Sequence, residues 1–146
     1  MLIPTKPLIV TGALGLGLGA ERVARALARG LLAAGRPPPE VCLLPEGLDS
    51  DPAMRTRLQE LVPEVSLRCA RAVILAEGLL EERTLARTAT FEIATRARQA
   101  GVPAYAVAAE NRLGSFDARM LDLQLILEAR TPRGLTAAGR RLAAVL

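Results

Sequence analysis

A loop rich in glycine separates a short apolar run from an amphipathic segment near the start of the chain. The stretch reads TGALGLGLGAERVARAL (11–27), and its glycines are Gly12, Gly15, Gly17 and Gly19. The backbone amides of a glycine loop that leads into a helix can hold an anion, because they are unpaired and lie at the positive end of the helix dipole. The spacing matches neither the dinucleotide-binding fingerprint nor the P-loop, which also needs a lysine followed by serine or threonine. The loop is therefore predicted either to hold a phosphate or to be a tight turn packed by Leu14, Leu16 and Leu18.

Carboxylates are the other candidates for chemistry, because the chain has no histidine. Without histidine, the commonest general base and the usual zinc partner are both missing. Glu46, Glu77 and Glu110 each follow an apolar run. Carboxylate oxygens suit Mg²⁺, which commonly bridges phosphates, so these glutamates form a tentative magnesium site beside a phosphorylated ligand. Solvated carboxylates on polar loops explain them without any ligand.

Two further residues complete the predicted ligand site. Gly78 directly follows Glu77, and Thr84 lies in the polar stretch EERTLART (81–88). The hydroxyl of Thr84 could orient a bound ligand, or it could cap a helix that begins there. The predicted ligand-binding set is thus the four loop glycines together with Glu77, Gly78 and Thr84.

Apolar runs alternate with amphipathic segments along the whole chain. The runs typical of strands cover 7–12, 40–47, 71–78, 102–110 and 121–129, and the helical segments cover 19–35, 49–62, 84–101 and 131–146. This alternation predicts an α/β fold, a Rossmann-like three-layer αβα sandwich with about five mostly parallel strands. In such a fold ligands bind at the carboxyl ends of the strands, so the glycine loop and the glutamates are expected at one edge of the sheet.

Composition limits the partners that the chain can have. Its 146 residues suit one domain, and 19 basic against 15 acidic residues give a net charge of +4. The basic residues are spread along the chain and are not interleaved with aromatic side chains, so no nucleic-acid partner is predicted. Arg22, Arg25 and Arg29 recur at helical spacing, which is typical of a solvated helix face.

The cysteines and the apolar runs indicate the cellular compartment in which the protein is expected. Cys42 and Cys69 both lie in apolar stretches, which favours buried thiols of a cytosolic protein over a disulfide. The start, MLIPTKPLIV, has no secretory-signal pattern, and no apolar stretch reaches membrane-spanning length. A cytoplasmic protein without a membrane partner is expected.

The segment AVILAEGLLEERTLARTATFEIATRARQAGVPAYAVAAE (72–110) resembles the C-terminal part of bacterial glycerate kinases. In that family an apolar strand leads into Gly-Glu-Gly-Arg-Leu-Asp, then Gln-Thr-Leu, a helix and a Gly-Val-Pro turn. The matching positions here include Glu77, Gly78, Leu80, Thr84, Leu85, Ala94, Ala97, Gly101, Val102 and Pro103. The first helix also looks like that family, at Leu18, Ala20, Glu21, Val23, Ala24, Gly30 and Leu31.

The resemblance implies a single-domain relative of a two-domain enzyme, with the other domain missing between about residues 48 and 71. If the chain were active, the family would make it an ATP-dependent phosphotransferase that uses Mg²⁺ and ATP and acts on a hydroxy acid. Gly12 and Gly15 stand where the family carries an aspartate and a lysine, and Leu79-Leu80-Glu81 and Arg87-Thr88 replace its Arg-Leu-Asp and Gly-Lys. These departures predict a protein without full kinase activity.

Two functions from different classes remain open at this point. In the first, the chain binds a phosphorylated small molecule, a nucleotide or a hydroxy acid at the strand carboxyl ends. In the second, it is a non-catalytic assembly or regulatory module that forms homo-oligomers through the face left by the missing domain. The residues leave open whether the chain is an enzyme.

Overall fold

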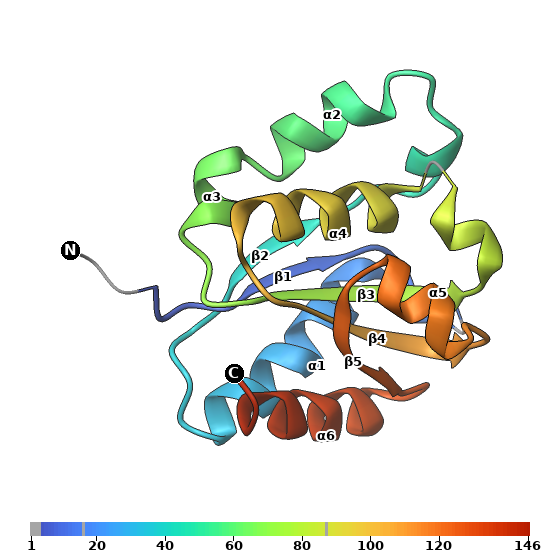
Figure 1. The fold of residues 1–146 in the computed structure, drawn as a ribbon. Coiled ribbons are helices and arrows are strands. Elements are labelled where there is room, and N and C mark those ends of the chain that lie inside the picture. The colour runs from blue at the N-terminus through green and yellow to red at the C-terminus, as the bar shows by residue number, and fades with distance from the viewer. Residues whose placement is uncertain (1–3, 16, 87) are drawn as a thin grey trace.

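Five strands form one parallel sheet in the computed structural model, which describes residues 4–15, 17–86 and 88–146 (Figure 1). The strand order is β2-β1-β3-β4-β5. The strands are β1 (Leu8–Thr11), β2 (Glu40–Leu43), β3 (Val73–Leu80), β4 (Ala104–Asn111) and β5 (Leu123–Glu128). The helices are α1 (Ala20–Ala33), α2 (Met54–Leu61), α3 (Glu64–Arg68), α4 (Ala89–Ala100), α5 (Ser115–Met120) and α6 (Pro132–Ala143), with 3₁₀ turns η1 (Leu48–Ser50) and η2 (Glu82–Leu85). The predicted Rossmann-like α/β fold is confirmed.

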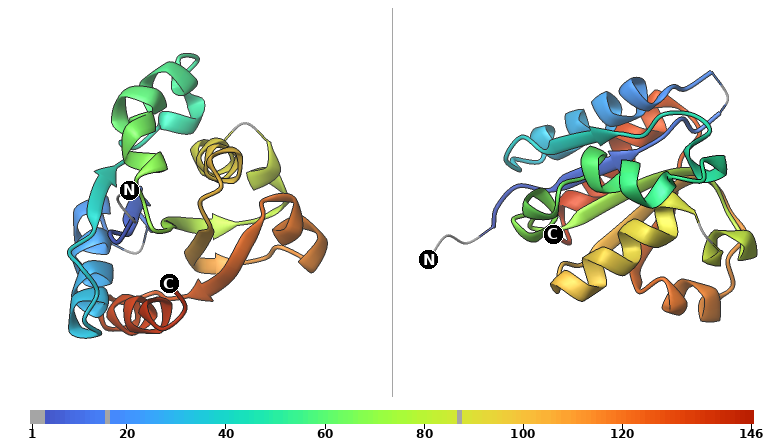
Figure 2. Two further views of the ribbon diagram at one scale, coloured as in Figure 1. Left: turned by 60° about the vertical axis from the view of Figure 1, so that its left-hand side comes forward. Right: turned by 90° about the horizontal axis from the view of Figure 1, so that it is seen from above.

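Helices cover both faces of the sheet and make two separate hydrophobic cores. Helices α2, α3 and α4 lie on one face, and α1 and α6 lie on the other (Figures 1 and 2). Within β1, Leu8 and Val10 belong to the core under α2 and α4, whereas Ile9 belongs to the core under α1 and α6. Successive side chains of a strand point to opposite faces, so a strand covered on both sides must be apolar throughout. The continuous apolar runs of the sequence reflect this double burial.

Helix α4 ends at Gly101, whose backbone conformation favours glycine. Gly101 has a positive φ of 72°, and it follows the last turn of α4. Side chains rarely adopt this left-handed conformation, which makes glycine the usual residue at a helix end. Pro103 then prevents any helical continuation and directs the chain into β4.

Three expected elements differ in detail from the structure. The helix expected over 49–62 is divided into η1 and α2, and α3 follows it after Pro63. The helix expected from residue 84 begins at Ala89, because Thr88 is its N-cap and accepts a hydrogen bond from the Phe91 amide at 3.1 Å. Helix α5 lies between the apolar runs 102–110 and 121–129, where no helix was expected. Each difference falls in a polar connection, where local patterns are weakest.

The two thiols differ in exposure. Cys42, on β2, is buried as predicted, whereas Cys69 is exposed. Cys69 is the C-cap of the short helix α3, where the chain turns toward β3, so the apolar run around it does not place it in the core. Within the described part of the chain, no helix is both long and apolar enough to cross a membrane.

Candidate functional site

A crevice of about 240 Å³ lies at the carboxyl ends of β1, β2 and β3. It is lined by Gly12, Ala13, Leu44, Pro45, Glu46, Gly47, Leu48, Asp49, Ala76, Glu77 and Ala89. Strand β1 lies between β2 and β3, so the chain leaves β1 in one direction and returns on its other side. Ligands of open α/β sheets bind beside such a reversal of strand order. The crevice therefore occupies the place where this fold most often holds a ligand.

Glu77 is a mostly buried carboxylic acid near the end of β3. The hydroxyl of Thr90, in the first turn of α4, donates a hydrogen bond to its Oε2 atom. Burial raises the pKa of Glu77, because it disfavours the charged carboxylate; the Thr90 hydrogen bond opposes this rise, and the charge of Asp49 adds to it. The pKa of Glu77 thus lies above that of a solvated glutamate.

Asp49 reaches the crevice from η1 and holds the start of α4. Its Oδ1 atom accepts a hydrogen bond from the Ala89 amide at 2.8 Å. The first amides of a helix lack partners within the helix and carry positive partial charge, so a carboxylate is favoured there. The loop after β2 is in this way fixed to α4, and a second carboxylate is placed near Glu77.

The crevice is acidic. Among the residues that the structure describes, its ionisable lining residues are Glu46, Asp49 and Glu77, and none of the described lining residues is basic. Glu46 is exposed at the mouth, on the loop after β2. Three carboxylates that line one crevice attract a cation or a group with several N–H donors, and they repel a phosphate.

The glycine loop folds back on itself. The Leu14 amide donates to the Leu18 carbonyl at 3.0 Å, and the Leu18 amide donates to the Gly15 carbonyl at 2.9 Å. Leu14 and Leu18 are both 4% exposed and pack in the core under α1 and α6. Gly15 and Gly17 have φ of 77° and 74°, which explains why glycine stands there. These observations favour the packed turn over the phosphate cradle; Leu16 lies outside the described residues.

The remaining residues of the predicted site are spread over different places. Gly12 lines the crevice, whereas Gly19 is the N-cap of α1. Gly78 lies under the glycine loop, where a Cβ atom would be 2.9 Å from the Leu14 carbonyl oxygen. Thr84 is buried in η2, where its hydroxyl accepts from the Glu81 amide at 3.0 Å.

The tentative magnesium site is not assembled. Glu46 and Glu77 line the same crevice, but Glu110 does not, and its carboxylate pairs with Arg112 at 3.1 Å. Over residues 4–15, 17–86 and 88–146, no three His, Cys, Asp or Glu side chains gather where they could hold a metal ion. The partners that the structure does bring to Glu77 are Thr90 and Asp49, which the sequence reasoning missed.

Comparison with known proteins supports the fold class and identifies no family or function. No family model matches the chain, and no curated protein matches it. A solved structure of the pilus assembly protein CpaE from Burkholderia thailandensis matches with a TM-score of 0.51 and 19% identity, over 97% of this chain and 99% of that one. Diflavin flavoprotein A3 from Nostoc sp. matches with a TM-score of 0.53 and 13% identity, over 96% of this chain and 92% of that one. At these identities the likeness shows the shared fold alone.

The resemblance to glycerate kinases is wrong. The structural neighbours are a pilus assembly protein and a flavoprotein, and no family or curated match supports a glycerate kinase. The matching residues explain the error. Ala94 and Ala97 are core positions of α4, and Gly101 with Pro103 forms its end and the turn into β4. A strand, a helix and a second strand that pack in this arrangement would carry the same residue types in an unrelated protein. The expectation of a missing domain depended on this resemblance alone.

Proposed function

We propose that the chain is a binding module whose site is the acidic crevice at the carboxyl ends of β1, β2 and β3. Its ligand is a small molecule that carries an ammonium group or several N–H donors. The observation that carries the proposal is the mostly buried Glu77 carboxyl in a crevice whose other ionisable lining residues, in the described part of the chain, are Glu46 and Asp49. Perturbed acids in a crevice are a feature of functional sites.

The raised pKa of Glu77 gives the proposed binding a defined pH dependence. An ammonium group beside Glu77 favours the charged carboxylate, which burial disfavours. Binding is therefore expected to strengthen as the pH rises through the pKa of Glu77 in the free protein. A hydrogen bond to a charged group contributes about 1.5–3 kcal/mol, so one such bond is a measurable part of the affinity.

The size of the crevice limits the ligand. Its volume of about 240 Å³ lies below the range of roughly 300–1,000 Å³ that is typical of sites for drug-sized ligands. A nucleotide is too large for it, and the carboxylates would repel the phosphates of a nucleotide or a phosphorylated sugar. An alkylamine or an amino alcohol suits both the size and the charge.

Thermal unfolding with ethanolamine and putrescine tests the proposal, with phosphate and glycerate as anionic comparisons. A ligand that binds the folded state raises the melting temperature, and the rise grows with the logarithm of the ratio of ligand concentration to Kd. The expected result is a rise with the amines for the wild-type protein and for Glu60→Gln, whose exposed side chain lies on α2 away from the crevice. Glu77→Gln keeps an acceptor for Thr90 but should abolish the rise. An equal rise in Glu77→Gln, or a rise with the anions alone, would contradict the proposal.

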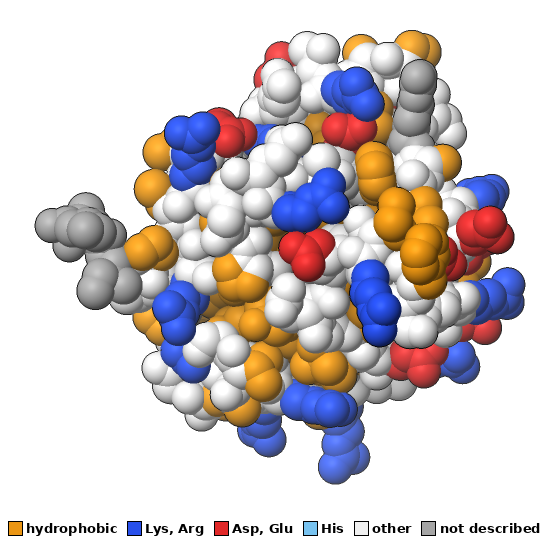
Figure 3. Space-filling model, viewed as in Figure 1, with side chains coloured by type: hydrophobic (Ala, Val, Ile, Leu, Met, Phe, Trp, Pro, Cys, Tyr) orange, Lys and Arg blue, Asp and Glu red, His pale blue; other side chains and the backbone are white. Residues whose placement is uncertain are grey.

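A second candidate, an assembly module, is favoured by the surface of α5. None of the residues of this helix is buried, and Phe116 and Met120, one turn apart, are 71% and 52% exposed. Figure 3 shows hydrophobic side chains gathered over η2 and α5. A second copy of the chain could cover this pair by a symmetric contact, and one neighbour in fold is a pilus assembly protein.

Sedimentation over a range of protein concentrations tests this second candidate. The expected result is a dimer that Phe116→Ser abolishes and that Val65→Ser leaves unchanged, since Val65 is 66% exposed on α3 at a different surface. A wild-type protein that stays monomeric at high concentration would exclude self-assembly through α5.

A further inference from the structure

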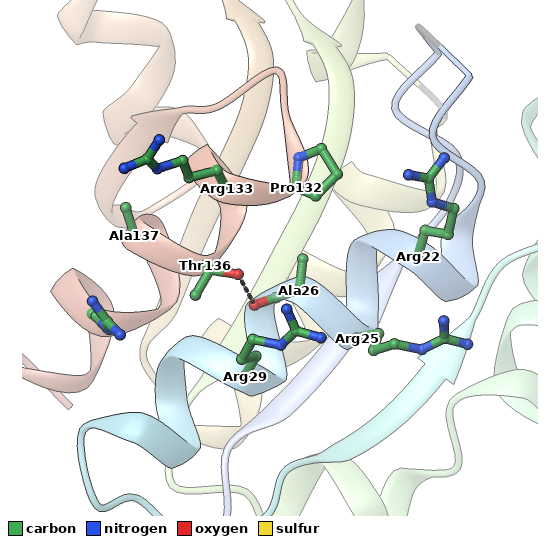
Figure 4. A pocket seen from close by; sticks show the side chains of 9 residues that line it. Arg22, Arg25, Ala26, Arg29, Pro132, Arg133, Thr136 and Ala137 are labelled. Carbon is green, nitrogen blue, oxygen red and sulfur yellow. Dashed lines mark hydrogen bonds between the residues drawn. The ribbon is translucent and has the colours of Figure 1, made fainter.

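Five arginines surround a groove of about 550 Å³ between α1 and α6, on the opposite face of the sheet from α4. Helix α1 contributes Arg22, Arg25 and Arg29, and helix α6 contributes Arg133 and Arg140. Figure 4 shows the arginines of α1 on one side of the groove and Arg133 on the other. Figure 3 shows blue side chains along the lower edge of the molecule, over α6. The solvated face predicted for α1 is therefore one wall of a larger basic groove.

The floor of the groove is held by close packing of the two helices. The Thr136 hydroxyl donates to the Ala26 carbonyl at 3.0 Å, and this hydrogen bond joins the helices at the centre of Figure 4. One turn further along α1, a Cβ atom at Gly30 would meet the backbone of α6. The floor residues Ala26, Pro132, Thr136 and Ala137 are small. The long arginine side chains thus extend from two helices that pack closely against each other.

The groove holds the whole net positive charge of the protein. Outside it, fourteen basic residues stand against fifteen acidic ones in the full sequence of net charge +4. Arg25 pairs with Glu21 at 3.0 Å, and both side chains are exposed. Among the residues that the structure describes, no salt bridge involves Arg29, Arg133 or Arg140. Arg25 also lies three and four residues from Arg22 and Arg29, spacings at which like charges repel.

We infer that this groove binds an oligophosphate, a compact anion with two or more linked phosphate groups. The guanidinium group offers a planar fork of N–H donors that matches phosphate oxygens. The volume lies in the range of small-molecule sites. An anion between the two helices would reduce the repulsion among these arginines, because three of them line the groove from α1 and two line it from α6.

The dimensions and the lining favour a small anion over a nucleic acid. The first and last groove arginines of each helix are seven positions apart in the chain, which is about 10 Å at 1.5 Å per residue. An oligophosphate can span this length, whereas a nucleic-acid strand would continue far beyond it. The aromatic residues of the chain are Phe91, Tyr105 and Phe116, and none of them lines the groove. Bases would therefore find no side chain on which to stack.

Calorimetric titration with tripolyphosphate at about physiological ionic strength tests the inference, because weak surface pairing is screened there. Parallel titrations use ATP, a single-stranded oligonucleotide and an octaglutamate peptide. The groove variant is Arg29→Gln/Arg133→Gln, which removes one arginine from each helix. The control variant is Arg98→Gln/Arg119→Gln, which removes the same charge from exposed positions on α4 and α5.

The expected result is one tripolyphosphate bound per chain, with affinity reduced about tenfold or more for each groove arginine removed and unchanged in the control. Equal affinity for tripolyphosphate and ATP would assign recognition to the phosphates alone, and tighter binding of ATP would identify a nucleotide as their source. The inference would be overturned by no binding of tripolyphosphate, or by equal losses in both double variants. Much tighter binding of the oligonucleotide or the peptide would also overturn it, in favour of a macromolecular partner.

Discussion

Replacing Gly30 by alanine tests the packing of α1 on α6, on which the arginine groove depends. A Cβ atom at Gly30 would lie 2.1 Å from the Thr136 carbonyl oxygen, 2.7 Å from the Arg140 nitrogen and 2.9 Å from the Gly139 Cα atom. All three are backbone atoms, so no side chain can turn aside to make room. The two helices must separate, and the buried contacts of Leu27, Leu31, Leu135 and Leu142 between them must loosen.

The size of the effect follows from two opposing contributions. Overpacking against fixed backbone costs about 3 kcal/mol, the upper part of its usual range. Alanine in place of glycine inside a helix returns about 1 kcal/mol through better helix propensity. We therefore expect Gly30→Ala to lower the free energy of unfolding by about 2 kcal/mol and the melting temperature by roughly 4–8 °C.

Urea denaturation and thermal unfolding measure this change, with Gly12→Ala as the control. The nearest atoms to a Cβ at Gly12 belong to Leu44 at 3.9 Å, an ordinary contact distance, so this variant should stay within about 0.5 kcal/mol of the wild type. If Gly30→Ala were as stable as the wild type or more stable, the helix-propensity gain would be the dominant effect. The close crossing of α1 and α6 would then not be a constraint on the fold.

Two further predictions concern Glu77. Because its pKa is raised in the folded state, its contribution to stability is fully present below the unfolded pKa and is lost as the pH rises through the folded pKa. Glu77→Gln should therefore gain stability relative to the wild type as the pH rises. Urea denaturation between about pH 4 and pH 8 measures the free energy of unfolding of both proteins. A variant whose stability relative to the wild type fell as the pH rose would contradict this prediction. Thr90→Val removes the hydroxyl that donates to Glu77 and should cost about 1–3 kcal/mol at neutral pH, measured by the same method. The same loss from Thr90→Val in a Glu77→Ala background would show that the hydrogen bond is not its cause.

The order of strands and helices could be predicted because it depends on local patterns. A buried parallel strand must be apolar throughout, and the segments that end at Gly35 and Gly101 end where φ is positive, at 83° and 72°. The order in which the strands lie side by side in the sheet is not a local property, since it depends on which faces pack together. Helix α5 escaped prediction because it buries no residue and so carries no periodic apolar pattern.

The candidate site was predicted less well, because its contacts join residues far apart in the chain. Asp49 accepts from the Ala89 amide forty positions away, and nothing near Asp49 in the sequence indicates this contact. Arg29 and Arg133 lie on different helices at opposite ends of the chain. Their proximity depends on Gly30 and Gly139, which allow the two helices to approach closely. Long-range packing decides which charged residues share a surface.

The position of a crevice and the chemistry of its ligand have separate origins in this protein. The reversal of strand order beside β1 lies next to a crevice at the carboxyl ends of the strands, which is the edge where the sequence led us to expect a ligand. The ligand class depends on the sign of the charge that lines the edge, and among the described residues Glu46, Asp49 and Glu77 line it without a basic lining residue. The arginines that suit a phosphate lie instead between α1 and α6, outside the carboxyl edge. The fold rule gives the position of a ligand but not its charge, whereas the lining charges support the cation that we propose for the crevice and the anion that we propose for the groove.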